Sequence, residues 1–129
     1  MILDTTFVID FLNGKGDAVA KMEWILDENM DHAITAPTIF ELWSGIISLG
    51  KGEKEKIKTK DFLNSQIIYS LSNESAEKSG KIHGELVKKG LTIDPEDCMI
   101  AGIALTNHKK VLTRDEHFRR IEGLSLVDY

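Results

Sequence analysis

Short apolar segments alternate with longer amphipathic segments along the whole chain. In the longer segments the apolar residues recur every three to four positions, which is the spacing of an amphipathic helix. The short segments have the length and composition of buried strands, and they lie at residues 1–3, 32–35, 66–71, 110–113 and 124–127. Strands that alternate with helices predict an α/β fold with a mainly parallel sheet of four to five strands, flanked by helices.

Capping residues predict where the helices begin. Thr5 or Thr6 is expected to cap the first helix, and Asp17 is expected to cap the second. Pro37 lies at the start of a helix over 38–49 that is apolar nearly all round. One face of that helix is expected to pack on the core and another on a partner, which suggests a homodimer. Further helices are expected at residues 50–64, 73–89, 94–107 and 116–121.

Length and composition indicate one globular domain over residues 1–129, with 42% apolar and 29% charged residues. No apolar run reaches the roughly 18 residues that a membrane-spanning helix needs, and no secretory signal is visible. The single cysteine, Cys98, cannot form an internal disulfide and is expected to be a small buried side chain. The cytoplasm is therefore the expected location, with no membrane association.

Four acidic residues stand within or directly after the apolar segments. Asp4 and Asp115 each follow a predicted strand, Glu41 lies in the apolar helix, and Asp97 lies in the first turn of a later helix. A charge in such surroundings is costly unless it is paired or binds a cation. Because the carboxyl ends of parallel strands meet at one edge of the sheet, Asp4 and Asp115 are expected to lie there together. If all four acids converge, they form an oxygen-rich pocket for Mg²⁺ or Mn²⁺.

Each acid also has a purely structural interpretation. Asp4 and Asp115 could be helix caps, Glu41 could be exposed, and Asp97 could only serve the dipole of its helix. Two further acids are assigned to such structural roles. Asp10 is interpreted as a solvent-exposed residue, and Asp94 as the cap of the helix that continues with Pro95.

The formal net charge of −5 disfavours broad electrostatic binding of nucleic acid without excluding it. The basic residues gather in two segments, 51–60 and 109–120. The first is interpreted as a solvated face. The second lies beside Asp115, and its candidates for contact with a substrate are Lys110, Arg114, His117 and Arg119.

The chain resembles PIN-domain proteins, and in particular the VapC-type toxin ribonucleases. Four stretches in the family's order carry the resemblance, which covers the whole chain: LDTTFVID at 3–10, FEL at 40–42, DCMIAG at 97–102 and LTRD at 112–115. The resemblance implies that a PIN-like three-layer fold brings together an acidic quartet that binds Mg²⁺ or Mn²⁺. The members of that quartet would be Asp4, Glu41, Asp97 and Asp115.

The same resemblance implies further roles and partners. The hydroxyl groups of Thr6 and Thr113 match positions that orient a carboxylate. Cys98 and Gly102 stand where alanine is commoner in the family, and both keep the side chain small. The implied partners are an RNA substrate, a second copy of the chain and a cognate VapB-type antitoxin.

The leading hypothesis is therefore a Mg²⁺- or Mn²⁺-dependent endoribonuclease, the toxin of a type II toxin–antitoxin pair. Asp4, Asp97 and Asp115 would bind the metal, and Glu41 would bind metal or position the attacking water. One rival is a phosphatase or phosphotransfer protein with Asp4 as nucleophile, although no second acid follows Asp4 closely. Another is a non-enzymatic module that binds a protein through the helix at 38–49.

Overall fold

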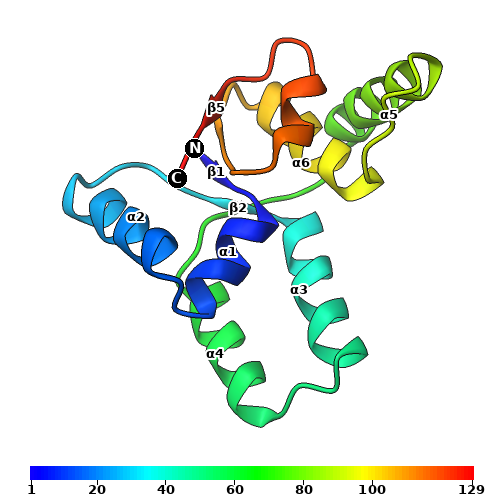
Figure 1. The fold of residues 1–129 in the computed structure, drawn as a ribbon. Coiled ribbons are helices and arrows are strands. Elements are labelled where there is room, and N and C mark those ends of the chain that lie inside the picture. The colour runs from blue at the N-terminus through cyan, green and yellow to red at the C-terminus, as the bar shows by residue number, and fades with distance from the viewer.

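The computed structural model describes residues 1–129 as an α/β fold with a central parallel sheet (Figure 1). Its strands are β1 (Ile2–Leu3), β2 (Ile34–Thr35), β3 (Ile68–Tyr69), β4 (Val111–Leu112) and β5 (Leu126–Val127). Every pair of neighbouring strands is parallel, and a bridge between Ile2 and Ala33 joins β1 to β2. The strands thus follow the order β3-β2-β1-β4-β5. The predicted parallel sheet of four to five strands is confirmed.

The helices fall close to the segments that the sequence predicts. They are α1 (Thr5–Leu12), α2 (Gly16–Asp27), α3 (Ala36–Ser48), α4 (Glu53–Asn64), α5 (Asn73–Lys88), α6 (Pro95–Thr106) and the 3₁₀ helix η1 (Glu116–Arg120). Two predicted caps are wrong. Asp4, not Thr5 or Thr6, caps α1, and Lys15 precedes α2 so that Asp17 lies in its first turn. In both cases the helix begins one or two residues earlier than the capping preference suggests.

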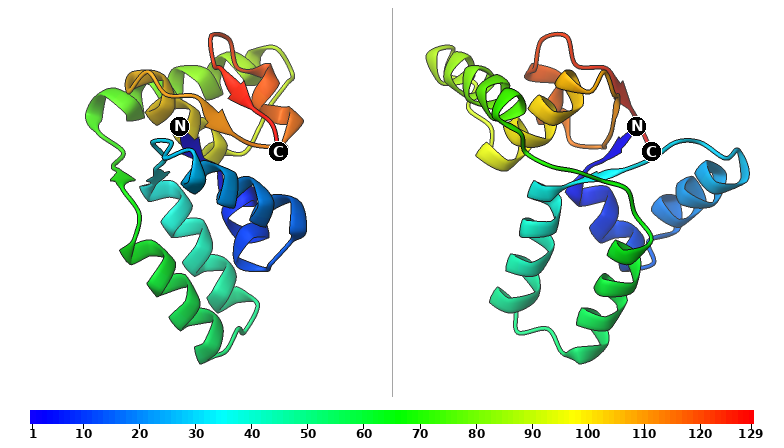
Figure 2. Two further views of the ribbon diagram at one scale, coloured as in Figure 1. Left: turned by 90° about the vertical axis from the view of Figure 1, so that its left-hand side faces the viewer. Right: turned by 180° about the vertical axis from the view of Figure 1, so that it is seen from behind.

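Alternate strand residues face opposite layers of the fold. Ile2 and Val111 belong to a core cluster with α5, α6 and η1, whereas Leu3 and Leu112 belong to a second cluster with α1 to α4. Figure 2 shows α5, α6 and η1 together on one side of the sheet, and α1 to α4 on the opposite side. A sheet covered on both faces explains why its strands are continuous apolar runs without alternation.

A close crossing of α5 and α6 fixes the position of the α6 helix. A Cβ atom added at Gly102 would lie 2.1 Å from Ser79 Oγ and 2.8 Å from the carbonyl oxygen of Ser75. The absence of a side chain at Gly102 therefore permits the close contact with α5. Since α6 carries Asp97 in its first turn, this crossing also helps to place an acid of the predicted quartet.

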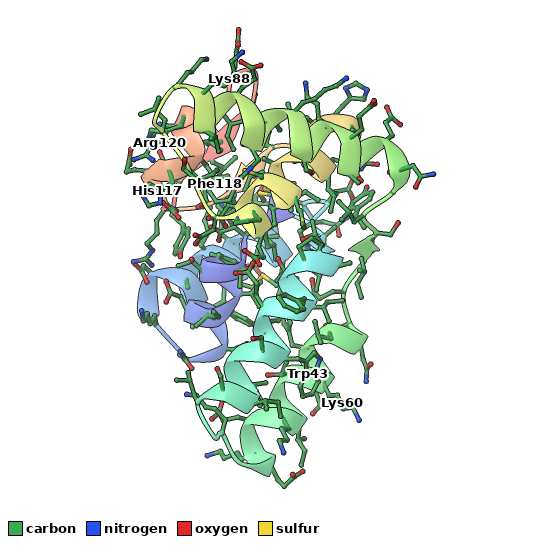
Figure 3. The ribbon with its side chains drawn as sticks, turned by 90° about the vertical axis from the view of Figure 1, so that its right-hand side faces the viewer. Trp43, Lys60, Lys88, His117, Phe118 and Arg120 are labelled. Carbon is green, nitrogen blue, oxygen red and sulfur yellow. The ribbon has the colours of Figure 1, made fainter.

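Helices α3 and α4 project from the sheet as a pair (Figures 1 and 2). Figure 3 shows Trp43 of α3 and Lys60 of α4 on this arm, away from His117 and Arg120 of η1. The outer side of α3 exposes Phe40 and Ile47 to solvent. The homodimer that its apolar sequence suggests stays a prediction. None of the helices has the length and hydropathy needed to cross a bilayer.

Candidate active site

Asp4 is a buried acid at the carboxyl end of β1, with 2% of its surface exposed. Its Oδ1 accepts a hydrogen bond from the backbone N–H of Phe7 at 2.7 Å, which makes it the cap of α1. Its Oδ2 accepts a hydrogen bond from the hydroxyl of Thr113. Burial raises the pKa of Asp4 to about 6, against these hydrogen bonds, and the charges of Asp115 and Glu41 raise it further. Asp4 is thus a cap and also part of an acidic cluster.

Thr113 connects the first acid to the last. Besides donating to Asp4, its Oγ1 accepts a hydrogen bond from the backbone N–H of Asp115 at 2.9 Å. Asp115 in turn caps η1, because its Oδ1 accepts a hydrogen bond from the N–H of His117 at 2.9 Å. The position of Thr113 suits the carboxylate-orienting role that the family resemblance implies.

Glu41 reaches the cluster from α3 and is half-buried. Its Oε1 accepts a hydrogen bond from Thr5 Oγ1 at 2.7 Å, and Thr5 Oγ1 lies 3.0 Å from Thr38 Oγ1. Burial is the main cause that raises the pKa of Glu41, and nearby acids in α6 and its cap add to it. Thr6, by contrast, is exposed and makes no hydrogen bond to a carboxylate. Thr5, rather than the predicted Thr6, makes the hydrogen bond that orients the Glu41 carboxylate.

Asp97 lies in the first turn of α6, where the helix dipole favours a charged carboxylate. Burial nevertheless raises the pKa of Asp97 to about 7. Four acids raise it further through their charges: Glu41, Asp115, Asp94 and Asp4. Desolvation and repulsion therefore outweigh the dipole. The acids predicted from the sequence are close enough to influence one another's ionisation, which is the convergence that the hypothesis requires.

The donor set fits a hard divalent cation. It consists of carboxylate oxygens, without cysteine or histidine in a zinc-like pattern, and its negative charges oppose one another. No three side chains from His, Cys, Asp or Glu form a finished metal-binding group in the present conformation. Hydrogen bonds aim Asp4, Glu41 and Asp115 at neighbouring N–H and hydroxyl groups. Cation binding would therefore require these carboxylates to turn toward one another.

Asp94 and Asp10 differ from their predicted roles. Asp94 occupies the cap position of α6, but its side chain makes no capping hydrogen bond. Its charge instead raises the pKa of both Asp97 and Glu41, so it extends the acidic cluster.

The interpretation of Asp10 as solvent-exposed is wrong, because only 3% of its surface is exposed. Its position on the buried side of α1 follows from helical phase, which places it near Phe7.

Cys98 is buried, as predicted. Burial raises the pKa of its thiol to about 11, and the charges of Asp97 and Asp94 act in the same direction. The thiol is therefore protonated near neutral pH and is a poor nucleophile.

The four predicted substrate-binding residues do not lie together. Lys110 precedes β4, whereas the acidic cluster lies at the carboxyl end of that strand. This placement argues against a role of Lys110 in binding substrate at the acids. His117 is exposed beside Asp115, with 3.2 Å between His117 Nδ1 and Asp115 Oδ1 (Figure 3). Arg119 is also exposed on η1.

Arg114 and the first basic segment are engaged in ion pairs. Arg114 Nη2 lies 2.7 Å from Asp17 Oδ2 and 3.2 Å from Asp10 Oδ2. In the segment 51–60, Lys56 and Lys58 pair with glutamates one helical turn away on α4. These exposed pairs agree with the predicted solvated face.

An apolar groove of about 170 Å³ begins at Glu41 and runs between α1, α3 and α4. Gly45 lines it, and a Cβ atom added there would meet nothing within 4 Å. Open space therefore lies beside Gly45, one helical turn from Glu41. The apolar walls of the groove include Ile9, Leu12, Leu42, Ile46 and Leu49.

Comparisons with known proteins agree with this fold and site. The family model described as the PIN domain matches residues 1–124, and the chain belongs to that family. The chain is 28% identical over 129 residues to Ribonuclease VapC2 of Rickettsia felis, covering 99% of this chain and 96% of that protein. It is 26% identical over 129 residues to the tRNA(fMet)-specific endonuclease VapC of Salmonella typhimurium, with the same two coverages.

A solved structure extends the likeness to three dimensions. The crystal structure of VapBC2 from Rickettsia felis, bound to a DNA fragment from the promoter, contains a chain that superposes with a TM-score of 0.87. The two chains are 26% identical, and the match covers 99% of this chain and 97% of the other. The predicted PIN-like fold of parallel strands flanked by helices is confirmed.

Proposed function

We propose that this chain is a Mg²⁺- or Mn²⁺-dependent endoribonuclease and the toxin of a type II toxin–antitoxin pair. The observation that carries the proposal is the convergence of buried acids: the charges of Glu41, Asp115 and Asp4 all act on Asp97, in addition to the burial that raises the pKa of Asp4, Glu41 and Asp97. Family membership and likeness to proteins named as ribonuclease and endonuclease support the same activity.

The side chains divide the work of hydrolysis. Asp4, Asp97 and Asp115 would hold the cation, which when bound neutralises charge on the phosphate and lowers the pKa of a water. Glu41, whose pKa is raised by burial, is suited to orient the attacking water and accept its proton. The water oxygen would attack phosphorus in line as the P–O3′ bond breaks, and O3′ would take a proton from solvent, so that the products are a 5′-phosphate and a 3′-hydroxyl.

RNA would approach from the side of η1, where His117 is exposed beside Asp115. Arg119, on the same helix, already pairs with Glu116 and Asp128. The proposed protein partner is a VapB-type antitoxin, in keeping with the likeness to the toxin chain of VapBC2. The exposed apolar side of α3, with Phe40 and Ile47, is the proposed homodimer face. The cytoplasm, where RNA and such an antitoxin meet, is the proposed location.

The phosphotransfer rival is less well supported by the site. A nucleophilic aspartate needs an accessible oxygen, yet Asp4 is buried and both of its oxygens accept hydrogen bonds. The purely interacting module does not explain why three acids of different elements are held together at an energetic cost.

The proposal is tested by incubating the purified chain with total RNA and mapping the ends of the products. Cleavage is expected with Mg²⁺ or Mn²⁺, is expected to stop with excess EDTA, and should leave 5′-phosphate and 3′-hydroxyl ends. Cleavage that persists in EDTA, or leaves 2′,3′-cyclic phosphate ends, would contradict the mechanism. A stable phosphoryl group on Asp4 would instead support the phosphotransfer rival.

A further inference from the structure

Arg114 is held by three residues from separate parts of the chain, and we call this group the arginine anchor. Its members are Arg114, which follows β4, Asp10 of α1, Asp17 of α2 and Tyr129, which follows β5. The guanidinium bridges the two carboxylates, and its Cζ atom lies 4.2 Å from the centroid of the Tyr129 ring. A planar guanidinium suits this combination of bridging and stacking, which a lysine ammonium cannot reproduce.

Asp10 is the buried centre of the anchor. Its Oδ2 accepts a hydrogen bond from the Tyr129 hydroxyl at 2.9 Å, and Lys15 Nζ lies 2.6 Å from its Oδ1. Burial by itself would raise the pKa of Asp10, but the contacts with Lys15, Tyr129 and Arg114 outweigh it and lower that pKa. A buried carboxylate with all of its partners in place is a rigid attachment point, and removing one partner is costly.

The anchor is connected to the acidic site through one short segment. Arg114 stands between Thr113, whose hydroxyl donates to Asp4, and Asp115, whose N–H donates to Thr113. The Tyr129 ring also packs edge-on against Phe7, with 4.7 Å between the ring centroids, and the N–H of Phe7 donates to Asp4. Both hydrogen bonds that Asp4 accepts therefore come from residues adjacent to the anchor.

We propose that the arginine anchor positions Thr113 and Asp115 for the acidic site, and that Arg114 is a positioning residue rather than an RNA-binding one. The inference rests on the proposed function. Two carboxylates already pair with Nη2 of Arg114 and offset its positive charge, which weakens its attraction for a phosphate. Its loss should loosen the segment from 113 to 115, and with it the orientation of Asp4 and the placement of Asp115.

The test is the Asp10→Asn variant, which preserves side-chain size and removes the buried one of the two charges that pair with Arg114. We expect the variant to fold, its Mn²⁺ affinity to fall about 10- to 100-fold, and its kcat at fixed subsaturating Mg²⁺ to fall in proportion. KM for RNA should change by less than about twofold, since substrate contacts are untouched. Tyr129→Phe keeps the ring under Arg114 and loses only the hydroxyl, so it should show a smaller effect of the same kind.

Two further variants separate the possible outcomes. Lys81→Ala also removes one charge from an ion pair, the exposed pair with Glu77 on α5, and should change neither Mn²⁺ affinity nor kcat. Arg114→Lys keeps the charge but not the anchor, so it should behave like Asp10→Asn, and combining the two should add little. An Arg114→Lys variant with raised KM and unchanged Mn²⁺ affinity would overturn the inference in favour of RNA binding.

The inference and the proposed function fail in different ways. Asp10→Asn could lower only the melting temperature, with Mn²⁺ affinity and kcat unchanged at temperatures where the variant is folded. In that case the anchor is merely structural and the inference is wrong. If the unmodified chain cleaves no RNA, the proposed function is wrong, while Mn²⁺ binding by the variants still tests the anchor.

Discussion

The Asp97→Asn variant is expected to lose RNA cleavage by about 10³-fold or more at saturating Mg²⁺, and to gain stability without metal at pH 8. The lost activity corresponds to about 4 kcal/mol of transition-state stabilisation, a reasonable share for one carboxylate of a metal site. The gain in stability follows because burial and neighbouring acids raise the pKa of Asp97 to about 7, so its charge opposes folding at pH 8.

A matched control distinguishes this effect from a general effect of acids at helix starts. Glu74 occupies the first turn of α5, as Asp97 does in α6, but lies outside the acidic cluster. Glu74→Gln should leave cleavage unchanged and slightly lower the melting temperature, because it only removes a favourable interaction with the helix dipole. Cleavage by Asp97→Asn at the rate of the unmodified chain would refute the assignment of Asp97 to the metal site.

Stability of the metal-free protein is expected to fall as the pH rises from about 4 to about 8. The pKa values of Asp4 and Asp97 are about 6 and about 7, above the ordinary value of 3.8. The folded state therefore binds more protons than the unfolded state in this range. The stabilisation is fully present below pH 3.8 and is lost as the pH rises through 6 and then 7. Asp10 has a lowered pKa, so its own contribution is lost only at lower pH.

Divalent cations should reverse this trend. Mg²⁺ or Mn²⁺ binds the deprotonated carboxylates, so its stabilising effect should be small at pH 5 and large at pH 8. Thermal melting at both pH values, in EDTA and in MnCl₂, measures the difference. A melting temperature that is independent of pH between 5 and 8 in EDTA would mean that burial and neighbouring charges do not raise the pKa values of Asp4 and Asp97.

The sequence is sufficient to predict the sheet and the four acids, because both depend on local patterns. Short apolar runs predict the strands, and Asp4 and Asp115 lie at strand ends whatever the details of packing. The position of Asp97 in the first turn of α6 is also predictable, because Pro95 marks the start of that helix.

Other features depend on contacts that no local pattern reveals. A difference of one residue in the phase of α1 decides that Thr5, and not Thr6, bonds to Glu41. The hydroxyl that bonds to the buried Asp10 belongs to Tyr129, 119 residues away in the sequence. Asp94 precedes Pro95 in a pattern typical of a helix cap. Its side chain nevertheless makes no capping hydrogen bond, and its charge adds to the acidic site.

Anomalous diffraction from crystals grown with Mn²⁺ would show whether the acids hold a metal ion. We expect one or two Mn²⁺ peaks at the carboxyl ends of β1 and β4, with oxygens of Asp4 and Asp97 at about 2.1 Å. We also expect the carboxylates to turn toward the ion from their present hydrogen-bonded positions. A saturating Mn²⁺ concentration that leaves this position without a peak, or places the ion on other residues, would contradict the account.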